Sequence, residues 1–300
     1  MSAPFAARLV DAVARRESQI VLGIDPDPAR LWPAAAAGVA AAAGAPAARA
    51  ADGVVRHCRA LIGAAAPACV AAKLQLASFE RLGAPGWAAL GEVVELAREA
   101  GLIVIADGKR GDVPVTAGAY AQALTGSTPT LAGAVGGLGV DAFTANPLLG
   151  VDALAPLIAT GAGVFVLVRT SNPGAADIMD AALADGGALW ERLARLVTEL
   201  GPPRHAGLAD VGAVVGATVP AHLERARALM PHAVFLLPGV GAQQGRAEDL
   251  GAAFAPGRAG GLISASRSIA GAHEDTGAPP GEAARAEAER LRAVAWSLSG

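Results

Sequence analysis

The sequence predicts a single (β/α)8 barrel, an α/β domain in which eight parallel strands alternate with helices. Three observations support this prediction. Eight short apolar runs recur along the 300 residues, most of them are followed by a segment of helical periodicity, and no linker of domain type interrupts the series. A chain of this length suits one barrel. A doubly wound open sheet would produce a similar pattern and is the alternative fold.

The expected elements follow from apolar runs and helical spacing. Strands are expected at 19–24, 69–73, 102–106, 140–144, 163–168, 210–215, 233–237 and 261–264. Helices are expected at 5–16, 47–63, 78–82, 86–100, 117–124, 151–159, 188–200, 221–230 and 281–298. We expect one domain over 1–300, with an Ala-rich helical insertion at about 34–66 and a closing C-terminal helix. Residues 126–139 are rich in turn formers and give no clear prediction.

Composition narrows the function classes. The net charge is −3 and the pI is near 6.0, without a basic stripe, so nucleic acid is not an expected partner. No strongly apolar run reaches 18 residues, so no membrane span is expected, and residues 1–18 are typical of a helix rather than a signal peptide. Cys58 and Cys69 are expected to be small buried side chains in a reducing cytoplasm.

The apolar run 102–106 ends directly in a charged cluster, Asp107-Gly-Lys109-Arg-Gly-Asp112. The C-terminal ends of buried parallel strands are where α/β barrels carry their chemistry. Asp107 and Lys109 are two residues apart, so they share one face if the strand continues that far. Gly108 and Gly111 are expected to allow tight turns and a close approach to a ligand.

Lysine usage strengthens this interpretation. Only two of the 24 basic residues are lysines, Lys73 and Lys109, and both follow apolar runs. A solvated surface tolerates arginine in place of lysine, whereas a proton donor does not, because arginine cannot release a proton near neutral pH. We therefore interpret both lysines as site residues. A structural salt-bridge network is the alternative, although buried ion pairs add little stability.

Other polar residues also stand at the predicted strand ends. They are Asp25, Thr144, Asn146, Ser171, Asn172, Thr218, Gln243 and Arg267. The loops after the seventh and eighth strands are the usual phosphate site of barrels, and here they contain Gly239, Gly241 and Arg267. A magnesium site made by Asp107 and Asp112 is disfavoured because Lys109 lies between them, and no histidine accompanies them to favour zinc.

At this point the residues resemble a known family. Asp107-Gly-Lys109-Arg-Gly-Asp112 is similar to the DxKxxD signature of orotidine 5′-phosphate decarboxylases, in the form found in their longer bacterial (type 2) branch. Further matching segments run along almost the whole chain. They are Gly23-Ile-Asp25-Pro26, Lys73-Leu-Gln75-Leu-Ala77-Ser-Phe79-Glu80, Thr144-Ala-Asn146-Pro147, Arg169-Thr-Ser171-Asn172-Pro173-Gly174, Val215-Gly-Ala-Thr218, Pro238-Gly-Val-Gly-Ala-Gln243 and Ser266-Arg267.

The resemblance implies a cofactor-free decarboxylation of a nucleotide by a homodimer, with no metal. Lys109 would donate the proton to C6 of the pyrimidine, Asp107 would face the substrate carboxylate, and Lys73 would bond the ribose and the aspartates. Asp112 would reach in from the other subunit. The remaining implied substrate-binding residues are Asp25 at a ribose hydroxyl, Thr116 beside Asp112, Asn146, Ser171 at the pyrimidine edge, and Gln243 and Arg267 at the 5′-phosphate.

Some positions depart from the pattern of this branch, and other functions stay open. Leu74 stands where Pro is frequent, Gln244 and Ser268 where Gly is usual, and Met179 where Gln is frequent. The two Gly replacements affect only the fine geometry of the phosphate loops. The rival functions are a Mg²⁺-dependent sugar-phosphate barrel enzyme, a Schiff-base aldolase, and a nucleotide-binding barrel without turnover.

Overall fold

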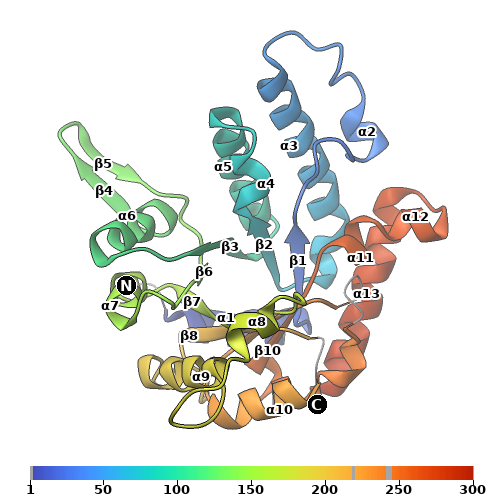
Figure 1. Cartoon of the computed structure of the whole chain (residues 1–300). Coiled ribbons are helices and arrows are strands. Elements are labelled where there is room, and N and C mark those ends of the chain that lie inside the picture. The colour runs from blue at the N-terminus through green and yellow to red at the C-terminus, as the bar shows by residue number, and fades with distance from the viewer. Residues whose placement is uncertain (1–2, 218–219, 241–244, 300) are drawn as a thin grey trace.

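The structure, a computed structural model, describes residues 3–217, 220–240 and 245–299. Eight parallel strands close a barrel in the order β1-β10-β9-β8-β7-β6-β3-β2, and helices surround it (Figure 1). This confirms the predicted (β/α)8 barrel and excludes an open sheet. The barrel strands are β1 Ile20–Ile24, β2 Ala71–Gln75, β3 Ile103–Arg110, β6 Ala142–Ala145, β7 Gly163–Arg169, β8 Val211–Val215, β9 Phe235–Pro238 and β10 Gly261–Ala265.

The helices mostly follow the predicted periodicity. The longer ones are α1 Phe5–Arg16, α3 Pro46–Ala65, α5 Ala84–Glu99, α6 Pro114–Leu124, α7 Val151–Ile158, α9 Leu189–Leu200, α10 Pro220–Leu229 and α13 Pro280–Leu298. The short ones are α2 Pro33–Ala36, α4 Leu76–Glu80, α8 Ala175–Met179, α11 Arg267–Ala270 and α12 Ala272–Thr276. Three-residue to four-residue 3-10 turns lie at 66–68, 247–249, 251–254 and 258–260. No helix in the described ranges is long and apolar enough to cross a membrane.

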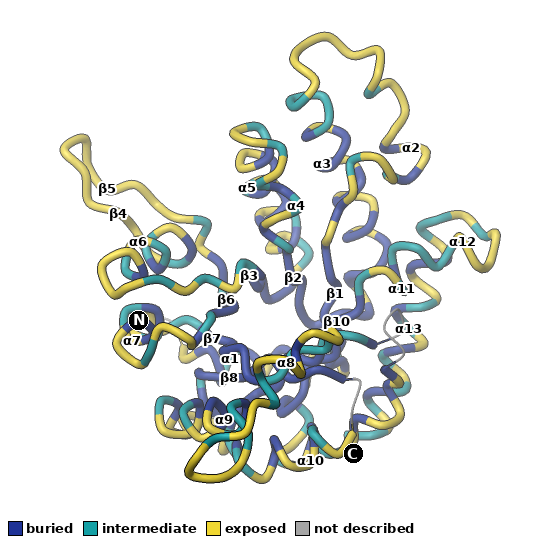
Figure 2. The backbone as a smooth tube through the Cα atoms, viewed as in Figure 1, coloured by how far each residue is buried: buried dark blue, intermediate teal, exposed yellow. Residues whose placement is uncertain are grey.

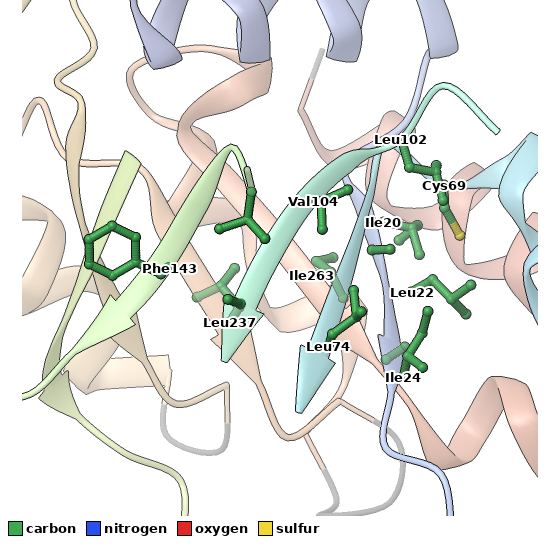
Figure 3. Close-up of a cluster of buried hydrophobic side chains, with 14 of the residues drawn as sticks. Ile20, Leu22, Ile24, Cys69, Leu74, Leu102, Val104, Phe143, Leu237 and Ile263 are labelled. Carbon is green, nitrogen blue, oxygen red and sulfur yellow. The ribbon is translucent and has the colours of Figure 1, made fainter. Parts of the chain in front are cut away.

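Alternate residues of the strands face two apolar cores. Ile20, Leu22 and Ile24 of β1 pack outward against the helices, in the larger core (Figure 3). Val21 points inward and joins a second core inside the barrel. This inner core fills the lower end of the barrel, where the strands begin. The polar side chains at the C-terminal ends of the strands therefore line only the opposite end, the mouth of the barrel.

Helix α1 covers the lower end of the barrel, where the strands begin. The ring of Phe5 meets the ring of Phe165 edge-on, with the centroids 5.9 Å apart. The backbone N–H of Ala6 donates to Asp210 Oδ1 over 2.7 Å, just before β8. Arg8 forms an ion pair with Asp141, just before β6. The helix is thus fastened to three neighbouring strands.

Two regions differ from the sequence-based expectation. Strand β2 begins at Ala71 rather than at residue 69, because Ala66–Ala68 form a 3-10 turn containing Pro67. Residues 126–139, which gave no clear prediction, form an antiparallel hairpin of β4 Ser127–Thr130 and β5 Gly133–Gly136. This hairpin stands away from the barrel beside α6 and is exposed throughout (Figure 2).

Candidate active site

Four ionisable side chains meet at the mouth of the barrel. The ammonium of Lys73, on β2, lies 2.8 Å from Asp107 Oδ2 and 3.7 Å from Asp25 Oδ1. The ammonium of Lys109 lies 2.6 Å from the other Asp107 oxygen. The hydroxyl of Thr144, at the end of β6, donates to the same oxygen over 2.9 Å. Asp25, Lys73, Asp107 and Lys109 therefore form a row of alternating charge within one chain.

Burial and charge together set the protonation of this row. Lys73 and Asp107 are each only 5% exposed. Burial disfavours the carboxylate of Asp107, but Lys73 and Lys109 outweigh this effect and lower its pKa to about 2. Burial likewise disfavours the ammonium of Lys73, but Asp107 and Asp25 outweigh it and raise the pKa of Lys73. Both groups stay charged at neutral pH, so the row provides a fixed field at the mouth.

The low pKa of Asp107 predicts an acid-dependent loss of stability. Its pKa is lowered from 3.8 to about 2 on folding. The ionised carboxylate therefore stabilises the folded state fully above about pH 4, and this stabilisation is lost as the pH falls toward 2. Between pH 5 and pH 2.5, we expect the unfolding free energy of wild type to fall by about 1.5 kcal/mol more than that of Asp107→Asn. Denaturant titrations at both pH values measure this. Asp275→Asn, at an exposed carboxylate, should behave as wild type, and equal acid dependence in all three proteins would contradict the assignment.

The backbone of Lys109 is unusual for a strand residue. Its φ is +48°, in the left-handed region that non-glycine residues rarely occupy, and the pairing of β3 with β6 shifts register between Ala106 and Arg110. The N–H of Lys109 donates to Thr144 Oγ1 over 2.8 Å, which holds this conformation. Strand β3 does continue to Arg110, so Asp107 and Lys109 share a face as expected. The bulge directs the Lys109 side chain, which is 41% exposed, toward the mouth.

A cavity of about 370 Å³ opens beside the row of charges. Asp25, Lys73, Asp107 and Lys109 line one side of it, and Ser171 lines another. The opposite side is formed by residues at or just beyond the ends of β9 and β10, namely Pro238, Gly239, Val240, Ser264, Ser266 and Arg267. Gly239 has a φ of +103°, which a side chain would not favour. The guanidinium of Arg267 makes no hydrogen bond or ion pair with the residues that the structure describes, so it can receive an anion.

Several predicted site residues do not line this cavity within one chain. The carboxylate of Asp112 accepts the N–H of Val113, and Thr116 is exposed on α6. Asn146 accepts the N–H of Leu148 in the turn after β6. Gln243 lies outside the described residues, as do Thr218, Gly241 and Gln244.

Gly108 and Gly111 have a packing role within this chain. Neither glycine has a positive φ, and neither lines the cavity beside the charged row. A Cβ at Gly108 would lie 2.6 Å from Leu76 Cδ1, and one at Gly111 would lie 2.9 Å from the carbonyl oxygen of Asn146. These glycines therefore make room for packing of the neighbouring strand ends.

Sequence reasoning overlooked three polar residues of the site. Gln75 Nε2 lies 3.4 Å from Asp107 Oδ2, and Thr170 and Ser264 line the cavity. The signal for Gln75 was available, because it stands two residues after Lys73 and must share its face of β2. Ser264 and Ser266 stand in the same relation to each other at the end of β10.

The fold and the site define an enzyme of the (β/α)8-barrel class, with ionisable side chains at the C-terminal ends of its strands. The chain belongs to the orotidine 5′-phosphate decarboxylase / HUMPS family, whose sequence profile matches residues 18–284. This confirms the family resemblance read from the motifs.

Individual relatives agree with the family assignment. The orotidine 5′-phosphate decarboxylase of Rhodopirellula baltica is 44% identical over 225 residues, which cover 73% of each chain. That of Roseiflexus castenholzii is 38% identical over 290 residues and 96% of each chain. The solved structure of Leishmania donovani OMP decarboxylase is similar with a TM-score of 0.72 and 33% identity, covering 98% of this chain and 99% of that chain.

Proposed function

We propose that this protein decarboxylates orotidine 5′-phosphate to uridine 5′-phosphate, the last step of pyrimidine nucleotide synthesis, without a cofactor. The observation that carries the proposal is the ammonium of Lys109, held 2.6 Å from Asp107 beside a cavity of about 370 Å³. The family and the curated relatives named above support the substrate. The two free cysteines, both buried, also fit a cytoplasmic location.

The chemistry requires that negative charge be stabilised at C6 of the pyrimidine. The bond from C6 to the carboxylate carbon breaks, CO₂ leaves, and the electron pair stays on C6. Lys109 would place a positive charge where this pair develops and would then transfer a proton to C6. One carboxylate oxygen of Asp107 holds the Lys109 ammonium in place, and the ammonium of Lys73 donates a hydrogen bond to the other oxygen.

Repulsion of the substrate carboxylate by Asp107 would contribute less. At a separation of ~4 Å and an effective dielectric constant near 20, one such contact amounts to roughly 4 kcal/mol. This is too little to supply the whole lowering of the barrier. Electrostatic stabilisation by Lys109 and binding of the distant phosphate therefore carry most of the proposed rate enhancement.

The cavity offers a place for each part of the nucleotide. The proposed phosphate ligands are Arg267 and Gln243, with the backbone at Gly239 beside Arg267. Asp25, 3.7 Å from Lys73, would accept a ribose hydroxyl, and Ser171 would read the pyrimidine edge. Asn146 is proposed to support the site from the turn after β6, where it packs against Gly111.

We further propose that the active protein is a homodimer in which Asp112 completes the site of the other subunit, with Thr116 beside it. Asp112 and Thr116 do not line the cavity of their own chain, although Asp112 follows Lys109 by only three residues. A partner that approaches along the start of α6 would receive both side chains. The site would then contain two lysines and three aspartates, counting Asp25.

A hybrid dimer tests the sharing of Asp112. Lys109→Ala and Asp112→Ala are expected to be nearly inactive as homodimers. After unfolding and refolding as a 1:1 mixture, we expect about a quarter of wild-type activity, because half of the dimers are hybrids and each hybrid holds one intact site. Activity no higher than that of the separate variants would show that Asp112 acts within its own chain.

The reaction itself is tested by the absorbance of orotidine 5′-phosphate with the pure protein in EDTA. Rapid loss of the orotate chromophore is expected. Activity that EDTA abolishes and Mg²⁺ restores would favour a metal-dependent barrel enzyme, and trapping by borohydride would indicate a Schiff base. Tight binding of uridine 5′-phosphate without turnover of orotidine 5′-phosphate would indicate a nucleotide-binding barrel that is not an enzyme.

A further inference from the structure

One stretch of the surface carries almost no charge. No Asp, Glu, Lys, Arg or His occurs between Asp112 and Asp141, although charged residues make up 17% of the chain. This stretch contains α6 and the β4–β5 hairpin. Surfaces that face only water are normally charged, whereas the centres of protein interfaces are depleted of charge.

Exposed apolar side chains gather on the same stretch and on the turn that follows it. Of the nine large hydrophobic residues that are exposed among the described residues, seven lie between 113 and 151. They are Val113, Val115, Leu131, Val135, Leu148, Leu149 and Val151. Helix α6 packs against both β4 and α7, so these seven residues lie on adjoining elements, and we call them the apolar patch.

The hairpin is the least supported part of this patch. Its four ladder pairs, from Ser127–Gly136 to Thr130–Gly133, leave Leu131 and Ala132 at the tip, and Leu131 is fully exposed. An isolated hairpin is only marginally stable in water. Pro129 lacks an N–H and interrupts strand addition along β4, so a partner would bind through side chains at the tip.

An apolar groove adjoins the patch on the same chain and shares Leu148 and Val151 with it. It has a volume of about 450 Å³ and runs between the turn before α7 and helix α9. Leu148, Val151, Leu189, Leu193 and Leu196 line it. Charged side chains line it as well, Asp185, Arg192, Arg195 and Glu199, which gives the groove the mixed character of an interface.

We propose that the β4–β5 hairpin is an arm that holds a second copy of this chain, with Leu131 seated in the groove beside α7 of that copy. The inference rests on the proposed dimer and specifies how it is held. A second copy is the occupant because Val113 and Val115 of the patch closely follow Asp112, which the partner's site would receive, and because one chain carries both the apolar tip and the apolar groove. Such a pair of surfaces allows a symmetric exchange of arms.

Removal of the arm tests the proposal. The N–H of Gly137 donates to the carbonyl of Gly126 over 2.9 Å, so residues 127–136 can be replaced by an Asn-Gly turn without moving the ends. We expect the dimer dissociation constant, measured by analytical ultracentrifugation, to rise at least ~100-fold. Leu131→Asp should act in the same direction, whereas Ala43→Asp adds the same charge to an exposed turn outside the patch and should change nothing. An unchanged dissociation constant in the deletion variant would overturn the proposal.

Cross-linking tests the position of the tip. Cys58 and Cys69 are buried, so introduced surface cysteines are the reactive thiols. A mixed dimer of Leu131→Cys and Leu148→Cys chains should form a disulfide-linked pair under mild oxidation. Linkage of Leu131→Cys chains only to one another would contradict seating in the groove.

The proposed arm and the proposed decarboxylation can be tested independently of each other. No residue of the hairpin lines the cavity, so the deletion variant should turn over substrate at concentrations that restore the dimer. A wild-type protein that dimerises through the arm but lacks decarboxylase activity would refute only the proposed function. An active dimer that is indifferent to the deletion would refute only the arm.

Discussion

Lys109→Ala should lower kcat/KM for orotidine 5′-phosphate by at least ~10⁴-fold, because it removes both the proton donor and the positive charge at the reacting carbon. Steady-state absorbance measurements give the ratio. Retention of near-normal turnover would show that Lys109 is not the proton donor.

Two controls separate the roles of Lys109. Lys109→Arg keeps a positive charge but cannot release a proton near neutral pH, so it should remain severely impaired. Lys109→Met keeps the length of the side chain without charge and should be as inactive as the alanine variant. The side chain of Lys109 is 41% exposed, so all three variants should fold and still bind uridine 5′-phosphate.

Arg267→Ala should lower kcat/KM by roughly 10³-fold, since a charge-assisted hydrogen bond to a phosphate contributes several kcal/mol. The expected loss depends on the phosphate. Wild type and variant should therefore turn over orotidine, which lacks the phosphate, at equally low rates.

The comparison of the two substrates decides the role of Arg267. An equal fall for both would mean that the substitution disturbs the mouth of the barrel rather than phosphate binding. Arg267 begins α11, with only Ser266 between it and the end of β10, and it is exposed, so the fold should tolerate alanine at this position.

The barrel could be predicted because each strand contains a short apolar run, and most of these runs stop at or close to a polar residue. Lys73, Asp107 and Lys109 were found by the same logic, since strand ends meet at one mouth. The hairpin 127–136 was missed because Gly, Thr and Ala give no apolar alternation, and because its few apolar side chains face solvent. Its structure depends on backbone pairing rather than on burial.

The bulge at Lys109 could not be predicted from spacing. It depends on a hydrogen bond to Thr144, which lies 35 residues further along the chain. The placement of Asp112 outside the cavity of its own chain does not follow from spacing either, because Asp112 stands only three residues after Lys109. Conversely, Gly108 and Gly111 suggested a ligand and serve packing, since a glycine in a sequence does not reveal what occupies the space beside it.

The docking of helix α1 onto strands far along the chain has a consequence for folding kinetics. The hydrogen bond from Ala6 to Asp210 joins residues 204 apart in the chain. Such a contact closes only after the intervening strands are ordered, because the loop entropy must first be overcome. We therefore expect α1 to dock late during folding and to detach first. Its amide protons should exchange faster than those of β6, β7 and β8, while the charged row at the opposite end of the barrel stays assembled.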